Sequence, residues 1–335
     1  MDKERLERYL SEKLPGFRGP MTLDKFSDGQ SNPTFLLRAA SGDYVLRRQP
    51  FGELLKSAHA VDREYRVLVA LANTGVPVAR AYLLCEDKSV IGSMFYIMSY
   101  EVGRIFWDST LPKIPEAERR QYYNAVIDTL AALHNLDPAS VGLGDYGRPG
   151  NYFARQISTW TKQYRASETE TVEPVEELID WLPKNCPADD GESKLVHGDF
   201  RIDNLIFEPD QPRVRAILDW ELSTLGHPLA DLAYFCMNLR LPTPKGLADC
   251  DRAALRLPEE EEIVARYCQA RGIGEIRQWH FYIAFAFFRL TAIVQGVKRR
   301  MLGGNASSAY ADQVGALVRP LAEMAVALIH ENTAR

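Results

Sequence analysis

The chain has 335 residues, with 40 Lys and Arg against 45 Asp and Glu, which gives a net charge of −5 at pH 7. Hydrophobic residues make up 46% and charged residues 25%, and this ordinary balance excludes a disordered chain, a collagen-like chain and a small disulfide scaffold. The length predicts about two domains, and the acidic balance argues against nucleic acid as a partner.

The five cysteines are scattered and form no CxxC pair, so we expect neither a disulfide framework nor a structural zinc site. Single cysteines of this kind fit a reducing compartment. The opening sequence MDKERLERYL lacks the apolar segment of a secretory signal. The most apolar window, residues 281–297, is shorter than a membrane-spanning helix and contains two polar residues. We therefore expect a cytoplasmic protein with no membrane partner.

Residues 1–100 are predicted to form a small domain with the element order β-β-α-β-β. Two runs of β-forming residues are joined by a Ser-Gly-Asp turn, a helix follows, and two more such runs close the domain. The predicted elements lie at 34–37, 44–47, 57–73, 81–84 and 95–98. The joint to the next domain is expected at the Val-Gly pair that follows residue 101.

Residues 101–335 are predicted to be mainly helical. Apolar residues recur at helical spacing in several segments. The predicted helices lie at 116–134, 151–166, 172–182, 229–239, 259–270, 279–300 and 308–329. A polar, turn-rich β island at 195–218 interrupts them, and such an island inside a helical domain is where chemistry is expected.

Two motifs lie in the island: HGDFRIDN at 197–204 and ILDWE at 217–221. A Pro-Asp-Gln-Pro turn makes the segment between them a hairpin, which brings Asn204 and Asp219 to the same end. An amide oxygen and a carboxylate there make a hard, oxygen-only site that suits Mg²⁺ held jointly with substrate phosphates. Asp199 lies one short loop upstream, where it can accept a proton from a hydroxyl.

The HGDxxxxN spacing resembles the HRDxxxxN catalytic loop of protein kinases, and Asp219 takes the place of the Asp in DFG. With Gly after the His and Trp after Asp219, residues 26–329 resemble the aminoglycoside phosphotransferase and choline kinase superfamily. The resemblance implies a bilobal, kinase-like α+β fold and ATP with Mg²⁺ as cofactors. It makes Asp199 the catalytic base, Asn204 and Asp219 the metal ligands, and His197 a packing residue of the loop.

The same resemblance places nucleotide-binding residues in the small lobe. Gly29, Ser31 and Asn32 lie in the loop before a strand, where backbone N–H groups can meet phosphate, although read alone this loop is an ordinary turn. Arg47 stands where kinases carry a lysine and can also grip phosphate oxygens. Glu64 shares the apolar stripe of its helix, so it is expected to pair with Arg47 rather than to join an exposed charged run.

Two more residues of the large lobe are singled out near the motif. Asp231 lies in an apolar helix and needs donors, which the backbone of the catalytic loop can supply, so we expect it to support the site. Arg201 follows Asp199 by two residues, where some kinases carry a lysine facing the transferred phosphate. It can equally be a solvent-facing loop residue.

The acceptor is expected to be a small molecule with a hydroxyl. The late helices offer Arg289, Gln295 and Arg299 as acceptor-binding candidates, with a structural arginine as the alternative for Arg289. The strings GQSNPTF, YVLRRQP, NYFARQ, DWELSTLGHPLADLAY and FRLTAIVQG resemble the kinase-like domain fused to acyl-CoA dehydrogenases and its stand-alone bacterial relatives. That resemblance implies a hydroxyacyl-CoA as acceptor.

Three alternatives stay open. The acceptor can instead be an aminoglycoside, a choline-like amine or a sugar. The chain can also be a nucleotide-binding pseudokinase module, although Asp199, Asn204 and Asp219 are all retained. An acyl-CoA hydrolase is the weakest alternative because a GxSxG nucleophile motif is missing. The sequence does not indicate an oligomeric state.

Overall fold

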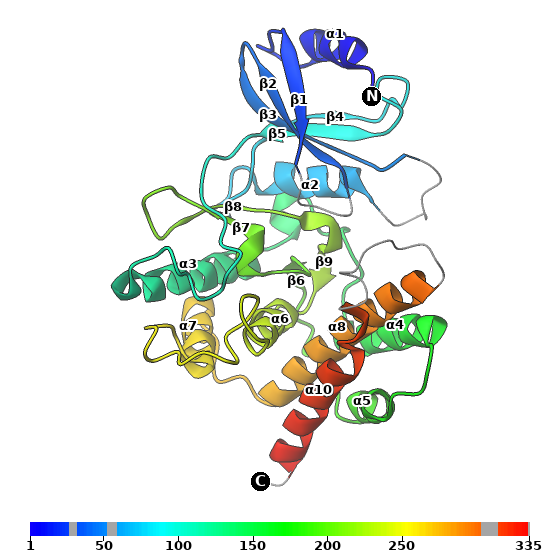
Figure 1. Cartoon of the computed structure of the whole chain (residues 1–335), viewed down its shortest axis with the longest axis vertical. Helices are drawn as coiled ribbons and strands as arrows, with labels where there is room; N and C mark the ends of the chain where they lie inside the picture. The colour runs from blue at the N-terminus through cyan, green and yellow to red at the C-terminus, as the bar shows by residue number, and fades with distance from the viewer. Residues whose placement is uncertain (27–31, 52–58, 303–313, 334–335) are drawn as a thin grey trace.

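The computed structural model describes residues 1–335 except 27–31, 52–58, 303–313 and 334–335. It has two lobes, a small one with an antiparallel sheet and a larger, mainly helical one (Figure 1). The predicted α+β, bilobal, kinase-like class is confirmed. The last strand of this sheet along the chain is Phe95–Ser99. The domain boundary at residue 100 stays a prediction.

The small lobe is built on a five-stranded sheet of order β1-β2-β3-β5-β4. Its strands are β1 (Met21–Lys25), β2 (Thr34–Ala39), β3 (Gly42–Arg48), β4 (Ala81–Cys85) and β5 (Phe95–Ser99), and α1 (Lys3–Lys13) packs on it (Figure 1). Sequence analysis missed α1 and β1. Helix α1 contributes only Leu6 and Leu10 to the core, one turn apart, which is too short an apolar stripe to stand out.

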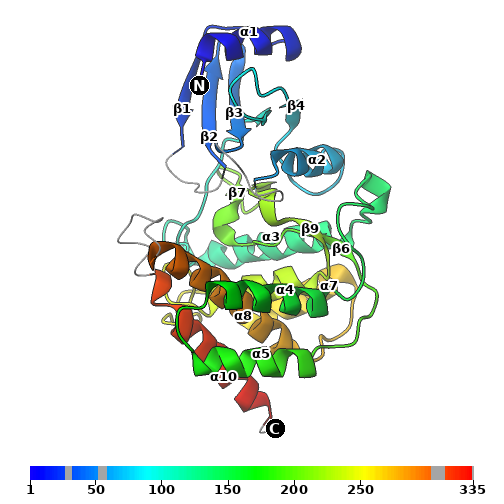
Figure 2. The ribbon, with the colours of Figure 1, turned by 90° about the vertical axis from the view of Figure 1, so that its right-hand side faces the viewer.

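The large lobe contains the elements that follow β5 in the described part of the chain (Figure 2). Its helices are α3 (Glu116–Asn135), α4 (Tyr152–Ser167), α5 (Glu173–Lys184), α6 (Leu229–Leu239), α7 (Glu260–Arg271), α8 (Trp279–Leu302) and α10 (Val318–Thr333). Its strands are β6 (Lys194–Val196), β7 (Leu205–Phe207), β8 (Val214–Ile217) and β9 (Thr224–Gly226). The predicted hairpin is confirmed as the β7–β8 pair. The predicted start of the last helix, at 308, lies outside the described residues.

Helix α8 has the length and hydropathy of a membrane span, and 72% of its most apolar window is buried inside the fold. Burial of this kind is what the core helix of a globular lobe also shows. The window at 281–297 is thus a buried helix, as predicted.

Helix α2 (Val61–Leu71) packs on the small-lobe strands β4 and β5 and also contacts the 3-10 turn Trp220–Leu222 of the large lobe. Its buried residues Val67, Leu68 and Leu71 join one hydrophobic cluster with residues of α3, α6 and α8. The Arg63 guanidinium donates to the backbone oxygen of Tyr146 at 2.8 Å and stacks over the ring, with 3.9 Å to its centroid. The Tyr146 hydroxyl in turn meets Ser223 at 2.9 Å. Tyr146 therefore fastens α2 to the large lobe.

Replacing Tyr146 by Ala should lower the free energy of unfolding by about 3–5 kcal/mol, because the buried ring leaves a cavity beneath α2. Tyr146→Phe is the matched control. It keeps the ring and loses only the hydroxyl contacts, so the expected loss is about 1 kcal/mol. Urea unfolding of the three proteins measures both values, and equal stability of the Ala and Phe variants would contradict this role.

Candidate active site

The β7–β8 hairpin brings Asn204 and Asp219 together, as the sequence predicts. Leu205 pairs with Ile217, and the Leu218 N–H donates to the Asn204 carbonyl at 2.8 Å. Asn204 therefore sits at the start of one strand and Asp219 just beyond the end of the other. Asp219 adopts a left-handed backbone conformation, with φ of 62°, which turns the chain sharply at this point.

His197 ties the loop that carries Asp199 to the hairpin. Its Nε2 donates to the Leu218 carbonyl at 2.7 Å, and its Nδ1 accepts from the Asp199 N–H at 3.1 Å. The imidazole is fully buried and packs on Trp220, with 4.9 Å between ring centroids. Both ring nitrogens are used inside the fold, so His197 acts as the predicted packing residue and has no lone pair to offer a substrate.

Asp231 lies directly beneath this loop. Its carboxylate accepts from the His197 N–H at 2.6 Å, the Gly198 N–H at 2.8 Å and His134 Nε2 at 3.2 Å. Burial alone would raise the pKa of Asp231, but these donors hold it below its ordinary value. The backbone donors were predicted from the sequence. His134 was not, because it lies 97 residues away on α3.

The Asp199 carboxylate is held on two sides. Asn204 Nδ2 donates to its backbone oxygen at 2.8 Å and to Oδ2 at 3.0 Å, and Arg201 Nε lies 3.3 Å from Oδ1. Tyr234 on α6 also faces it. Burial and the nearby negative charge of Asp199 raise the pKa of the Tyr234 hydroxyl, so this group stays a neutral donor. Sequence analysis missed Tyr234, which lies on a uniformly apolar helix.

Arg201 lies between two carboxylates rather than pointing freely into solvent. It is 3.3 Å from Asp199 and 3.3 Å from Asp203. Burial lowers the pKa of Arg201, yet the two carboxylates outweigh it and raise the value, so the guanidinium stays charged. Its predicted part opposite a transferred phosphate stays a prediction.

Arg47 joins the small lobe to the hairpin. Its guanidinium makes ion pairs at 2.7 Å with both Glu64 on α2 and Asp219 beyond β8. Burial opposes the charge of Arg47, but these carboxylates raise its pKa. The predicted pairing with Glu64 is present in the structure. Arg48 projects from the other face of β3 and stacks on Phe51, with 3.7 Å to the ring centroid.

Asn32 supports Glu64 instead of lying open toward a ligand. Its Nδ2 donates to Glu64 at 2.7 Å, and the Tyr96 hydroxyl donates to the same carboxylate at 3.1 Å. The Asn32 side chain is thus used inside the fold, while a contact of its backbone N–H with phosphate stays a prediction. The other two residues proposed for this loop, Gly29 and Ser31, lie outside the described residues.

The three acceptor candidates on α8 have different surroundings. Arg289 donates to the Gly198 carbonyl at 2.5 Å, and its guanidinium carbon lies 5.0 Å from the centroid of the Tyr234 ring, so it lies against the catalytic loop. Gln295 is buried and donates to the Ser167 carbonyl at 2.6 Å. Its amide nitrogen is thus used to hold the α4–α5 connection, which corrects the expectation that it faces an acceptor. Arg299 is exposed.

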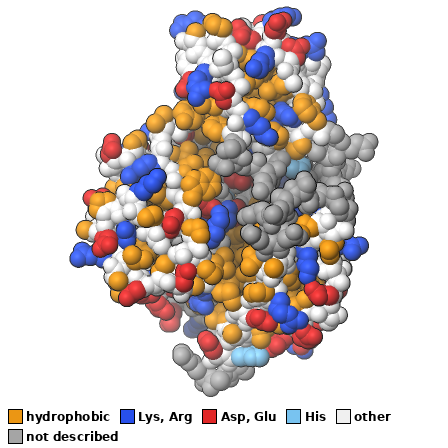
Figure 3. Space-filling view, in the orientation of Figure 1, with side chains coloured by type: hydrophobic (Ala, Val, Ile, Leu, Met, Phe, Trp, Pro, Cys, Tyr) orange, Lys and Arg blue, Asp and Glu red, His pale blue; other side chains and the backbone are white. Residues whose placement is uncertain are grey.

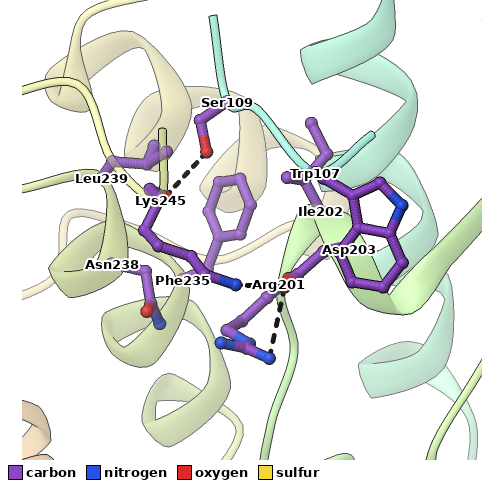
Figure 4. Close-up of a pocket in the computed structure, with 9 residues that line it drawn as sticks. All are labelled: Trp107, Ser109, Arg201, Ile202, Asp203, Phe235, Asn238, Leu239 and Lys245. Atoms are coloured by element: carbon purple, nitrogen blue, oxygen red, sulfur yellow. Dashed lines mark hydrogen bonds and ion pairs between the residues drawn. The ribbon is translucent and has the colours of Figure 1, made fainter. Parts of the chain in front are cut away.

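A pocket opens beside the catalytic loop (Figure 4). Arg201 and Asp203 form one side of it, Lys245 reaches in from the loop after α6, and Trp107 stands across from them. Sequence analysis missed Trp107, Asp203 and Lys245. Of these three, only Asp203 could have been found from the sequence, because it lies inside the HGDxxxxN motif.

Comparisons with known proteins agree with this geometry. The model described as the phosphotransferase enzyme family matches residues 22–282. Acyl-CoA dehydrogenase family member 10 of Mus musculus is 48% identical over 328 residues, which cover 96% of this chain and 31% of that protein. Acyl-CoA dehydrogenase family member 11 of Gallus gallus is 46% identical over 337 residues, which cover 98% and 43%. The chain therefore spans less than half the length of these relatives.

Solved structures have the same fold. A candidate aminoglycoside phosphotransferase from Ralstonia eutropha JMP134 is 46% identical, with a TM-score of 0.91 and 98% of both chains covered. A thermostable mutant of aminoglycoside phosphotransferase APH(4)-Ia, in a ternary complex with ADP and hygromycin B, is 16% identical, with a TM-score of 0.64. That match covers 96% of this chain and 98% of the other, and it shows likeness of fold alone.

The Asp231→Asn substitution should lower the free energy of unfolding by about 3 kcal/mol at pH 7, because it removes a buried charge from three donors. The folded pKa of Asp231 is depressed, so its contribution is complete above about pH 4 and shrinks as pH falls through the folded value. Urea unfolding at several pH values measures the difference between the two proteins. The exposed Asp180→Asn variant is the control, and a difference that grows toward low pH would contradict the role of Asp231.

Proposed function

Because the chain belongs to the phosphotransferase enzyme family and is a small-molecule kinase, we propose that it moves the γ-phosphoryl group of ATP to the hydroxyl of a hydroxyacyl-CoA. The observation that carries the proposal is the fixed carboxylate of Asp199, held by Asn204 and Arg201 beside the hairpin end that carries Asp219. A positioned acid–base group next to a metal-binding pair is what phosphoryl transfer to a hydroxyl requires.

Asp199 is the general base of the proposed reaction. The acceptor oxygen forms a bond to the γ-phosphorus while the bond from that phosphorus to ADP breaks, and the hydroxyl proton passes to the Asp199 carboxylate. The hydrogen bond from Asn204 and the ion pair with Arg201 fix the carboxylate, so its orientation is set before the acceptor arrives. Arg201 also lies where it can face the phosphoryl group as negative charge redistributes.

Asn204 and Asp219 would hold Mg²⁺. The side-chain hydrogen bonds of Asn204 go through Nδ2, so its amide oxygen is turned away from Asp199, and the Asp219 carboxylate is about one third exposed. These are the hard oxygen donors that Mg²⁺ prefers, so the residues fit the ion. When bound, Mg²⁺ supplies positive charge that neutralises the phosphates.

The small lobe would bind the nucleotide. Arg47 remains charged between Glu64 and Asp219, so it places a fixed positive charge beside the proposed nucleotide site. The segment after β5 would meet the adenine edge with its backbone. It is held in place by Glu101, which pairs with Arg215 of β8 at 2.7 Å.

A hydroxyacyl-CoA is favoured as acceptor by two observations. Relatives at 46–48% identity are named acyl-CoA dehydrogenase family members, in which this chain matches a part. Arg201 and Arg289 also bring positive charge to the catalytic loop, which suits an anionic acceptor better than a cation. An aminoglycoside is the second candidate, favoured by the name of the 46% identical Ralstonia eutropha protein.

The Asp199→Asn variant should lose at least about 100-fold in turnover, the usual effect of removing a positioned acid–base group. A coupled assay of ADP release, run with a panel of hydroxyacyl-CoA thioesters and aminoglycosides, measures the loss and identifies the acceptor. Asp210→Asn, on the exposed β7–β8 turn, is the matched control and should retain full rates. Full turnover by the Asp199 variant would refute the assignment of the base.

The Arg47→Lys variant should raise the KM for ATP and lower kcat, by about tenfold in kcat/KM. A lysine keeps the charge but cannot reach Glu64 and Asp219 together through one planar group. Steady-state kinetics with varied ATP checks this. Arg48→Lys changes the neighbouring residue on the opposite face of β3 and serves as the control. Equal KM values for ATP in both variants would contradict a role for Arg47 at the nucleotide.

A further inference from the structure

The pocket beside the catalytic loop is built from two segments that are tied together. Ser109 is buried, its N–H donates to the Pro244 carbonyl at 2.9 Å, and its hydroxyl donates to the Lys245 carbonyl at 2.8 Å. Trp107, two residues before Ser109, is thus fixed relative to Lys245 (Figure 4). The two side chains stand on opposite sides of a narrow pocket of about 10 Å³, which has room for about one water, so an acceptor would lie across its open mouth.

Lys245 is only partly used by the fold. Its Nζ lies 3.3 Å from Asp203 Oδ2, and Arg201 Nη2 lies at the same distance from the same atom. The Asp203 side chain is only 8% exposed, and Arg201 would still neutralise it if Lys245 were bound to something else. The Lys245 side chain is 49% exposed. An ammonium has three donors, so Lys245 retains donors for a ligand in the pocket.

The charges around the catalytic loop are close to balanced, and Lys245 is a more exposed cation there than Arg201. Arg201, Arg289 and Lys245 stand against the carboxylates of Asp199, Asp203 and Asp219, and Asp219 is also paired with Arg47. The charge of Asp231 beneath the loop is already met by backbone donors and by His134. The exposed ammonium of Lys245 attracts a negatively charged group to this side of the loop.

Trp107 adds an apolar wall. Trp107 is 53% exposed, so its indole is accessible to a ligand at the mouth of the pocket. The surface view shows hydrophobic side chains next to basic and acidic ones in the hollow beneath the small lobe (Figure 3). An indole beside an ammonium suits a molecule that carries an apolar or flat part next to an anionic group.

We propose that Lys245 and Trp107 form a specificity site for the phosphoryl acceptor, in which Lys245 binds an anionic group and Trp107 packs on the adjoining part of the same molecule. This rests on the proposed function, because it places the acceptor hydroxyl at Asp199 and the rest of the molecule over the neighbouring pocket. The chemistry required is a carboxylate or phosphate carried by the acceptor, and it disfavours cationic acceptors.

Three acceptors with the same hydroxyacyl group show which anionic group binds Lys245. The CoA thioester carries phosphates, the N-acetylcysteamine thioester is uncharged, and the free hydroxy acid carries a carboxylate. In the Lys245→Glu variant, the KM for the anionic acceptor that binds this site should rise about five- to tenfold. The KM for the uncharged thioester and the KM for ATP should stay within twofold of the wild-type values.

Lys184→Glu on α5 makes the same charge change at an exposed position and is the matched control. Trp107→Ala should raise the acceptor KM about tenfold, with partial recovery in Trp107→Phe.

An equal effect of Lys245→Glu on all three acceptors, or none on any of them, would overturn the proposal. If the wild-type enzyme turns over none of the three while it phosphorylates an aminoglycoside, the proposed acceptor class fails instead. In that case Lys245→Glu should lower the KM for the cationic acceptor, and a KM left unchanged would overturn the specificity site as well.

Discussion

The Arg47 guanidinium joins three parts of the molecule through one planar group. It extends from the sheet of the small lobe, pairs with Glu64 on α2 and reaches Asp219 at the end of the hairpin in the large lobe. Glu64 is buried, so its charge requires a partner of this kind. The partner also fixes the distance between the sheet and the hairpin. The position of the small lobe relative to Asn204 and Asp219 thus depends in part on this ion-pair network.

A second buried charge fixes the catalytic loop. Asp231 holds the N–H groups of His197 and Gly198, and His197 in turn holds the Leu218 carbonyl just before Asp219. Gly198 adopts a positive φ of 85°, and a Cβ there would lie 2.6 Å from the Leu222 carbonyl oxygen, so only glycine fits the turn. The loop and the hairpin are therefore held together as one unit. The orientation of Asp199 is set by Asp231 and His197, which accept hydrogen bonds from the backbone of residues 197–199.

The residues that the sequence located are those whose neighbours lie close in the chain. The spacing from Asp199 to Asn204 and the hairpin up to Asp219 fix the relative positions of these three side chains through local structure. An acid on an apolar helix face, such as Glu64 or Asp231, indicates that a buried partner must lie opposite it. Tyr234, Trp107 and Lys245 had no such signal, because their positions depend on how distant segments pack. Gln295 was misjudged for the same reason, since a polar residue on an apolar helix can face a cleft or a neighbouring loop.

The packing of α2 limits how this kinase can be controlled. In a fold of this type, a swing of the helix that carries Glu64 would separate Glu64 from Arg47. Here such a swing would also withdraw Val67, Leu68 and Leu71 from the shared core, and each costs about 1.5–3 kcal/mol to expose. It would further break the contacts of Arg63 with Tyr146. The helix is thus held in the paired position by strands of the small lobe and by residues of the large lobe together.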